Sequence, residues 1–494
     1  MFKKKILVGA LLALVVAASC KKDPVNTETD KDAEKEILFR DSAYYYSLAL
    51  SLWTDKLPQP KLIGNEPDLK SFTGKFKTAE EVLDELRKSA TLDRFSFVDR
   101  AGTVSEEIQQ GVYKETGATP IFLLESAGST NANLYIRYVQ KNSPAAKAGL
   151  IRGMRVVSIN GDTKVDYNSE SANEFKNAMK FFSGETLKLV VVSPIDGKES
   201  TITVTGDAYQ IDPIMVNKVI DHNGKKVGYM AYTSFVNLYN NQGQPNSYHT
   251  AMENAFKAFE GVDELVIDLR YNGGGSTWSA EYLANQLVPT THAKALMYKY
   301  KVNYVLEDAG LLQPGKAFGP VYFDKKNTLN LKRVYFLGTK QTASASELVI
   351  NSLKPYMDVQ LITVRGNDGS IGTYGKPVGF FESKVVHGYG SYYITSFQMV
   401  NKDEFGDYFN GLKGEKTDSY ESFALQLGDP NERMFSDALY HITNGTYRSA
   451  SASMRRTTKS GKPEMEANSV QPQSPHVTGM FKFSNEQNLK NILK

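Results

Sequence analysis

The chain has 494 residues, which is too long for one ordinary domain and predicts two to four folded units. Hydrophobic residues make up 41% of it and charged residues 23%, a composition typical of globular proteins. The 58 basic and 55 acidic residues leave a formal net charge of only +3, so the charge balance gives no indication of nucleic acid or of a strongly acidic partner.

The first residues have the pattern of a secretion signal. Residues 3–5 are all lysine, and the apolar run 6–18 that follows is too short to span a bilayer comfortably. Cys20, the only cysteine, comes after small residues and looks like the cysteine of a bacterial lipobox. We therefore expect a signal peptide at residues 1–19 and a lipid on Cys20 that anchors the protein in the cell envelope, at the outer membrane, facing the periplasm or the cell surface. The alternative is an ordinary signal peptide with a cysteine there by chance.

Both ends of the remaining chain are polar. Residues 20–36 mix both charge signs without apolar periodicity, which predicts a flexible linker. Ser, Lys, Pro, Gln and Asn dominate residues 449–475, so we expect residues 449–494 to be a mostly flexible tail. Apolar residues between Val477 and Leu493 are compatible with docking on the folded part, at a place that the sequence does not indicate.

Residues 37–110 have the apolar periodicity of helices. An aromatic and apolar face runs from Tyr44 to Trp53, and Thr78 is a candidate N-cap for a second helix at residues 79–88. We interpret the aromatic face as core packing, with a binding platform as the alternative. A small helical domain is the prediction for this part of the chain.

Strands dominate residues 111–206. The expected elements are strands at 134–139, 154–161 and 187–192, a short helix at 143–150 and an amphipathic helix at 171–182. The segment NSPAAKAGLIRGMRVVSINGD, which begins at Asn142, resembles the middle of a PDZ domain. That resemblance implies a module that binds the C-terminus of a peptide as an added edge strand. The loop expected to hold the carboxylate, residues 116–122, lacks the usual glycine-rich form.

Residues 207–448 alternate between strands and helices, which predicts α/β layers around a largely parallel sheet. The expected strands are 227–232, 264–268 and 332–337, and the expected helices are 247–259, 276–287 and 346–355.

Two turns at the ends of these strands carry candidate chemistry. In the first, residues 268–275 (DLRYNGGG), three consecutive glycines give the backbone freedom to expose amides to a developing oxyanion. A tight strand-to-helix turn is the alternative, and the spacing fits neither phosphate-binding glycine motif. In the second, residues 342–347 (TASASE), Ser344 lies near the positive end of a helix, which favours an anionic intermediate. The alternative is that Ser344 or Ser346 only caps that helix.

The third candidate is Lys376, in the segment TYGKP. A lysine serves as a general base only if burial or nearby positive charge lowers its pKa towards neutrality. The flanking residues 361–379 are fairly apolar and rich in glycine, as such a pocket requires, whereas a solvated surface charge is the alternative.

Three segments in this order, ELVIDLRYNGGG, GTKQTASASELVINSLKPY and TYGKPVG, resemble the C-terminal processing peptidases, the serine–lysine proteases of family S41 with a PDZ domain. The resemblance covers residues 111–446, and residues 425–442 are similar to the closing segment of the lipoprotein branch. It implies a multidomain α/β fold with a helical N-terminal region, a β-rich PDZ-like domain at 111–206 and an α/β serine-protease core of the ClpP/crotonase-like type at 207–448.

The resemblance also implies roles for single residues. Ser344 would be the nucleophile and Lys376 the general base, the amides of Gly274 and Ala345 would line the oxyanion hole, and Ser346 would cap the helix. The implied activity is that of a serine endopeptidase that cleaves exported proteins and takes peptides or unfolded proteins as substrates, through their C-termini, without a cofactor. No two of the six histidines have metal-ligand spacing, so no metal is expected.

Phe380 departs from the family pattern, because many members carry at this position a glutamine that orients the lysine. The stretch between Ser344 and Lys376 is also longer than usual. An alternative function is therefore a catalytically weak or inactive lipoprotein that binds peptides through its PDZ domain.

Overall fold

The computed structural model describes residues 28–64, 66–124, 129–240, 242–365, 371–386, 389–448 and 475–483. The expected signal peptide and Cys20 lie outside the described residues, as do residues 449–474 of the expected tail. Within the described ranges, no helix combines the length and the apolar character needed to cross a membrane.

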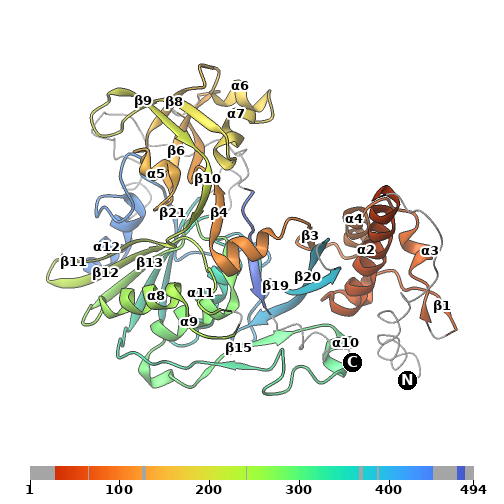
Figure 1. The fold of residues 1–494 in the computed structure, drawn as a ribbon. Helices are drawn as coiled ribbons and strands as arrows, with labels where there is room; N and C mark the ends of the chain where they lie inside the picture. The colour runs from red at the N-terminus through yellow and green to blue at the C-terminus, as the bar shows by residue number, and fades with distance from the viewer. Residues whose placement is uncertain are drawn as a thin grey trace.

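A six-stranded sheet forms the centre of the molecule (Figure 1). Its order is β11 (Ile214–His222), β12 (Lys225–Tyr232), β13 (Glu264–Asp268), β17 (Arg333–Gly338), β18 (Asp358–Val364) and β21 (Lys416–Ser419). All neighbours are parallel except β11 and β12, which confirms the predicted, largely parallel sheet.

Helices cover both faces of this sheet because alternate side chains of each strand point to opposite sides. Met230, Ile267 and Phe336 face one side and belong to the same core as helices α8 (Ser247–Lys257), α9 (Thr277–Leu287) and α11 (Ala345–Leu353). Tyr229 and Tyr335 face the other side and pack with α12 (Arg433–Asn444). The expected strand and helix positions in this region agree with these bounds to within a few residues.

A second, mixed sheet lies beside the first and was not predicted. Its order is β14 (Gly274–Ser276), β22 (Gly479–Lys482), β19 (Val378–Val386), β20 (Gly390–Val400), β15 (Leu296–Lys301) and β16 (Val321–Tyr322), and β3 (Phe97–Asp99) also pairs with β20. Strand β22 comes from the segment expected to be a flexible tail. A flexible tail is wrong for residues 479–482, where the docking that the apolar residues after Val477 allowed takes place: they form an inner strand parallel to both β14 and β19.

Residues 118–205 form a five-stranded antiparallel sheet with a hydrophobic core of its own (Figure 1). The strands are β5 (Ala118–Leu124), β6 (Ala132–Val139), β7 (Arg155–Ile159), β8 (Thr186–Val192) and β9 (Glu199–Thr205), in that order, and helix α5 (Pro144–Lys147) lies between β6 and β7. Asn160 and Gly161 both have positive φ, of 53° and 87°, as a tight Asn-Gly turn after β7 requires. Strand β4 (Val112–Glu115) pairs with β10 (Asp207–Gln210) at the base of this unit.

The single helix predicted for residues 171–182 is wrong. Glu174 and Phe175 adopt left-handed φ angles of 54° and 57°, which split the segment into α6 (Tyr167–Ser171) and α7 (Lys176–Met179). The buried Glu170 carboxylate accepts hydrogen bonds from the amides of Asn177 and Ala178 and so caps the second helix.

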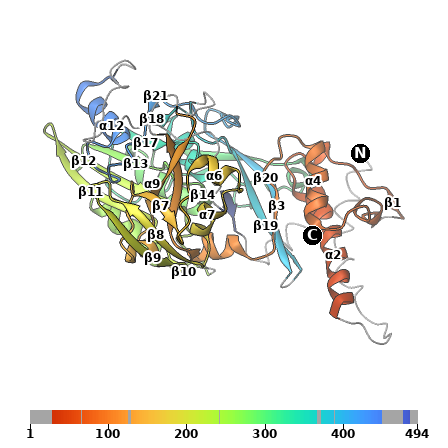
Figure 2. The ribbon, with the colours of Figure 1, turned by 90° about the horizontal axis from the view of Figure 1, so that it is seen from above.

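Helices α2 (Glu28–Leu50), α3 (Lys70–Thr73) and α4 (Ala79–Ser89) gather at one end (Figure 1), and α2 and α4 lie beside β3, β19 and β20 (Figure 2). Tyr44 is buried there, which confirms core packing for the aromatic face, and Thr78 caps α4 by accepting from the Glu81 amide at 3.3 Å. The predicted flexible linker at 20–36 is wrong from residue 28 onwards, since α2 already begins at Glu28.

Candidate active site

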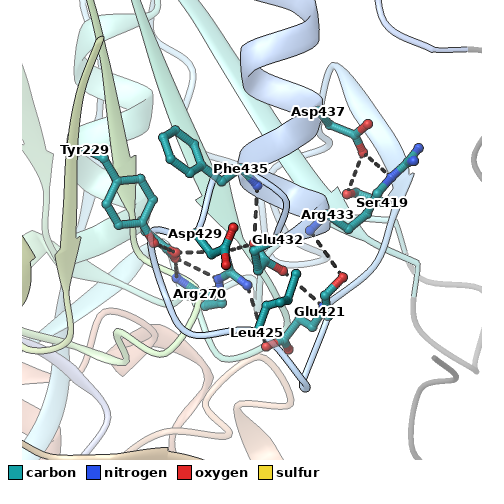
Figure 3. Close-up of polar contacts among 12 residues, drawn as sticks. Tyr229, Arg270, Ser419, Glu421, Leu425, Asp429, Glu432, Arg433, Phe435 and Asp437 are labelled. Atoms are coloured by element: carbon teal, nitrogen blue, oxygen red, sulfur yellow. Dashed lines mark hydrogen bonds and ion pairs between the residues drawn. The ribbon is translucent and has the colours of Figure 1, made fainter. Parts of the chain in front are cut away.

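Buried charges surround Arg270, which lies in the glycine turn after β13 (Figure 3). The Arg270 guanidinium lies 2.8 Å from a carboxylate oxygen of Asp268 and 2.8 Å from one of Glu432, and Tyr229 donates its hydroxyl to Asp268. Burial acts to lower the pKa of Arg270, but the two carboxylates raise it well above its usual value. A buried charge needs partners of opposite charge, and these two carboxylates hold Arg270 at the start of the turn.

A second arginine connects this network to the sheet β5–β9. Arg152, which precedes β7, lies 3.4 Å from Glu421 and donates to the Leu425 carbonyl at 3.0 Å. It also contacts the hydroxyl of Tyr271, and Tyr271 in turn donates to Glu421. The five-stranded unit therefore contacts the glycine turn through buried polar groups.

The glycines of the turn allow backbones to approach closely. Gly274 and Gly275 have φ angles of 110° and 139°, which favour glycine. A Cβ on Gly274 would lie 2.4 Å from the Gly479 carbonyl oxygen of β22, and one on Gly275 would lie 2.3 Å from that of Phe235. The Gly274 amide, predicted to line the oxyanion hole, donates here to Asn272 Oδ1 at 2.9 Å. The triple glycine therefore accommodates neighbouring strands as well as giving access to amides.

Ser344 lies in a strained turn directly before α11. Its φ of 61° and ψ of −107° are rare for any residue with a side chain, a conformation that costs about 1–3 kcal/mol and persists at functional sites. The residue is fully buried, and its Oγ donates to the Val378 carbonyl at a long 3.5 Å. Across the described ranges, the amide of Ala345 has no hydrogen-bond acceptor, so it is available to an oxyanion.

The predicted capping role of Ser346 is wrong. Ser344 occupies the N-cap position, and Ser346 lies inside α11, where its hydroxyl donates to the Asn272 carbonyl at 3.0 Å. This contact reaches across to the glycine turn. Ser346 thus joins the two predicted functional turns instead of capping the amino end of α11.

A buried carboxylate for which no role was predicted, that of Glu347, holds the turns of Ser344 and Lys376 together. Glu347 Oε2 accepts from the amides of Ser344 at 2.7 Å and Lys376 at 2.9 Å. Its Oε1 accepts from the Gly375 amide at 2.8 Å and from the Thr373 hydroxyl. Burial raises the pKa of Glu347 while these four donors oppose the rise. One side chain therefore sets the distance between the loops of Ser344 and Lys376.

Lys376 is buried, with 4% of its surface exposed, so the alternative of a solvated surface lysine is wrong. Its Nζ lies 4.4 Å from the centre of the Phe380 ring and donates to the Thr478 carbonyl at 2.6 Å. Desolvation lowers the pKa of Lys376 to about 7, against the opposing effect of nearby carboxylates. Much of the amine is therefore uncharged at neutral pH, as a general base requires.

The structure thus brings Ser344, Ala345, Gly274 and Lys376 to one place, at the carboxyl ends of β13 and β17 and the amino end of β19. In the part of the chain that the structure describes, no hydrogen bond joins Ser344 Oγ to Lys376 Nζ. The lysine amine is bonded instead to Thr478 of the C-terminal segment, a partner for which the sequence offered no signal.

Comparison with known proteins relates part of this site to a known family. The model of peptidase family S41 matches residues 226–374, a range that holds the glycine turn and Ser344 and ends just before Lys376. The chain therefore contains a region of the peptidase family S41 type.

Two curated proteins are similar to this chain over part of its length. A carboxyl-terminal-processing protease of Picosynechococcus sp. is 25% identical over 212 residues, which are 43% of this chain and 45% of that protein. The carboxy-terminal processing protease CtpB of Bacillus subtilis is 26% identical over 225 residues, 43% of this chain and 39% of that protein. The chain thus spans less than half the length of the curated relatives that it matches.

A solved structure named "Putative S41 protease from Bacteroides fragilis" has the same fold as this chain. It is 24% identical, with a TM-score of 0.64, and the alignment covers 87% of this chain and 100% of that one. The likeness extends over all of the solved chain and is therefore not confined to the range matched by the family model.

Proposed function

We propose that the chain is a serine endopeptidase of the C-terminal processing type, with Ser344 as nucleophile and Lys376 as general base. The observation that carries this proposal is the buried lysine, whose pKa is lowered to about 7 and whose loop shares the carboxylate of Glu347 with the loop of Ser344. A buried lysine with a neutral pKa has a cost in stability that catalysis would explain.

In the proposed reaction, the neutral Lys376 amine takes the proton from Ser344 Oγ as that oxygen attacks the substrate carbonyl carbon. The oxyanion that forms is bound by the Ala345 amide and by the Gly274 amide, which must first leave Asn272 Oδ1. The protonated lysine then gives its proton to the leaving amine as the peptide bond breaks. Water activated by the same amine hydrolyses the acyl-enzyme and frees Ser344.

Further parts of the proposal concern the substrate and its location. We propose that a lipid on Cys20 anchors the protein in the cell envelope, at the outer membrane, where it meets exported proteins. We also propose that residues 111–206 act as a PDZ-type module that binds the C-terminus of an unfolded substrate. In support, β5 is at the edge of its sheet, where a peptide can add as a further strand.

Hydrolysis of an unstructured protein tests the catalytic part. Ser344→Ala and Lys376→Ala should each abolish cleavage, and the double variant should be no worse than either single one, because both groups act in one step. Activity that survives Ser344→Ala would contradict the assignment. A folded wild type without activity on unfolded proteins and peptides would favour a peptide-binding lipoprotein instead.

Membrane fractionation tests the anchor separately. Cys20→Ala should move the protein out of the membrane fraction or block its processing, since lipid chains would supply the membrane affinity. A Cys20→Ala protein that is processed normally and stays in the membrane would contradict the lipid anchor without affecting the catalytic proposal.

A further inference from the structure

The C-terminal segment of residues 476–482 is built into the site next to Lys376. Strand β22 lies between β14, which continues the glycine turn, and β19, which begins two residues after Lys376. The Gly479 amide donates to the Gly273 carbonyl at 3.0 Å. The carbonyl of the preceding residue, Thr478, accepts from Lys376 Nζ at 2.6 Å. One peptide group of this segment thus contacts both the glycine turn and the lysine.

The contact fits the needs of a general base. A neutral lysine amine has two N–H groups and one lone pair, and a carbonyl can only accept, so the Thr478 oxygen takes up one N–H and leaves the lone pair for another partner. After proton transfer the same oxygen stabilises the ammonium, because hydrogen bonds to charged groups are the stronger ones. Phe380 gives Lys376 only an aromatic face, which attracts a cation but does not fix the direction of the lone pair.

The segment is held firmly in place, as a positioning group must be. Met480 and Phe481 are almost completely buried, in two different hydrophobic clusters. At the other end, the two ring nitrogens of His476 lie 2.9 Å from Glu107 and 3.1 Å from Glu115. An inner strand fixed at both ends is poorly suited to act as a removable inhibitor.

From this geometry we propose that the main-chain carbonyl of Thr478 positions the Lys376 amine for proton transfer and takes the orienting role that Phe380 cannot fill. Residues 476–482 are therefore part of the catalytic unit. This inference rests on the proposed peptidase function and adds to it the group that orients the base.

Gly479→Ala is the first test, because a Cβ there would lie 2.6 Å from Phe380 Cε2 and 3.2 Å from Lys376 Nζ. Gly184→Ala is the matched control, since its Cβ would meet nothing closer than 3.7 Å. We expect kcat/KM to fall about 10²-fold in Gly479→Ala, as for a displaced catalytic group, with a shifted pH profile and an unchanged control. Full activity with an unchanged profile, or activity above that of the wild type, would overturn the proposal. The second of these results would make the segment an inhibitor.

A change to the carbonyl alone keeps the proposal testable if Gly479→Ala fails to fold. The full chain can be assembled by ligating a synthetic segment that begins with Ser474→Cys, with the Thr478–Gly479 amide replaced by an ester. The ester carbonyl is a weaker acceptor and stabilises the ammonium less. Relative to the ligated all-amide protein, kcat/KM should therefore fall about 5-fold, and its rise with pH should occur at lower pH. Loss of the hydrogen bond from the Gly479 amide alone would not change the pH at which kcat/KM rises. Identical pH profiles in the two ligated proteins would overturn the proposal.

One measurement separates this inference from the proposed function. NMR titration of isotope-labelled Lys376 reads its pKa without any substrate. If the wild type hydrolyses nothing, the peptidase function fails, but a pKa that differs between ester and amide proteins still supports the contact. An unchanged pKa contradicts it.

Discussion

Replacing Lys376 by methionine should abolish activity and yet make the protein more stable at neutral pH. Burial lowers the pKa of this lysine from 10.5 to about 7, a difference that corresponds to about 5 kcal/mol against its charged form. The methionine variant avoids this cost but leaves the Thr478 carbonyl without its donor, which costs about 1–2 kcal/mol. The net gain in the free energy of unfolding should be about 3 kcal/mol at or below pH 7.

The pH dependence of this gain is the sharper test. Between pH 7 and 10.5 the unfolded chain holds a proton on Lys376 that the folded chain does not, so the stability of the wild type rises with pH across this window. The advantage of Lys376→Met should therefore be largest at pH 6, smaller at pH 8 and absent near pH 10. Urea unfolding followed by tryptophan fluorescence measures it.

A suitable control is Lys340→Met. Lys340 Nζ also donates to a main-chain carbonyl, that of Thr373 at 3.0 Å, but this lysine is only partly buried. The reasoning would be refuted if Lys376→Met were less stable than the wild type at every pH, or if its advantage did not shrink between pH 6 and pH 10.

Three further predictions concern the neighbours of the site. Phe380→Leu removes the aromatic face that favours the ammonium, so the rise of kcat/KM with pH, expected near pH 7, should shift to lower pH by about half a unit. A shift to higher pH would contradict this. Glu347→Gln places an NH2 group against amide donors and should cost about 2–3 kcal/mol of stability and most of the activity, measured by thermal unfolding and peptide hydrolysis; normal activity would exclude its role in joining the two loops. Ser346→Ala loses the hydrogen bond to the Asn272 carbonyl and should cost about 1 kcal/mol of stability and part of kcat. Ser352→Ala, in the same helix, should be neutral, because the buried Ser352 hydroxyl has no partner in the described structure. Equal effects of the two changes would argue against the Asn272 contact.

Local patterns in the sequence predicted much of the fold. The strand–turn–helix units around residues 264–287 and 333–353 could be predicted because their periodicity and their glycine and serine turns lie within short windows. The split helix near Phe175 could not, since the left-handed residues depend on the carboxylate of Glu170, which caps a second helix from outside it.

The site was predicted by residue type but not by its connections. Ser344 and Lys376 stand in recognisable turns, yet Glu347 looked like an ordinary acid in the first turn of a helix. Its four donors come from both loops, a fact that only the tertiary structure reveals. Thr478 lies about a hundred residues beyond the lysine that it contacts, and the apolar residues after it indicated docking but not where, so no local pattern could indicate this contact.

The position of β22 near the end of the described chain also determines when the site can be completed during synthesis. This strand follows all the other described strands, so the ribosome releases it after both of its neighbours, β14 and β19. A chain that is still being synthesised already carries Ser344 and Lys376. It lacks β22, the strand that joins β14, after the glycine turn, to β19, after Lys376. Under the proposed arrangement, the lysine gains its orienting carbonyl only when this late segment has been made and inserted. A nascent or partly folded chain would therefore lack a positioned base until this last described strand is in place.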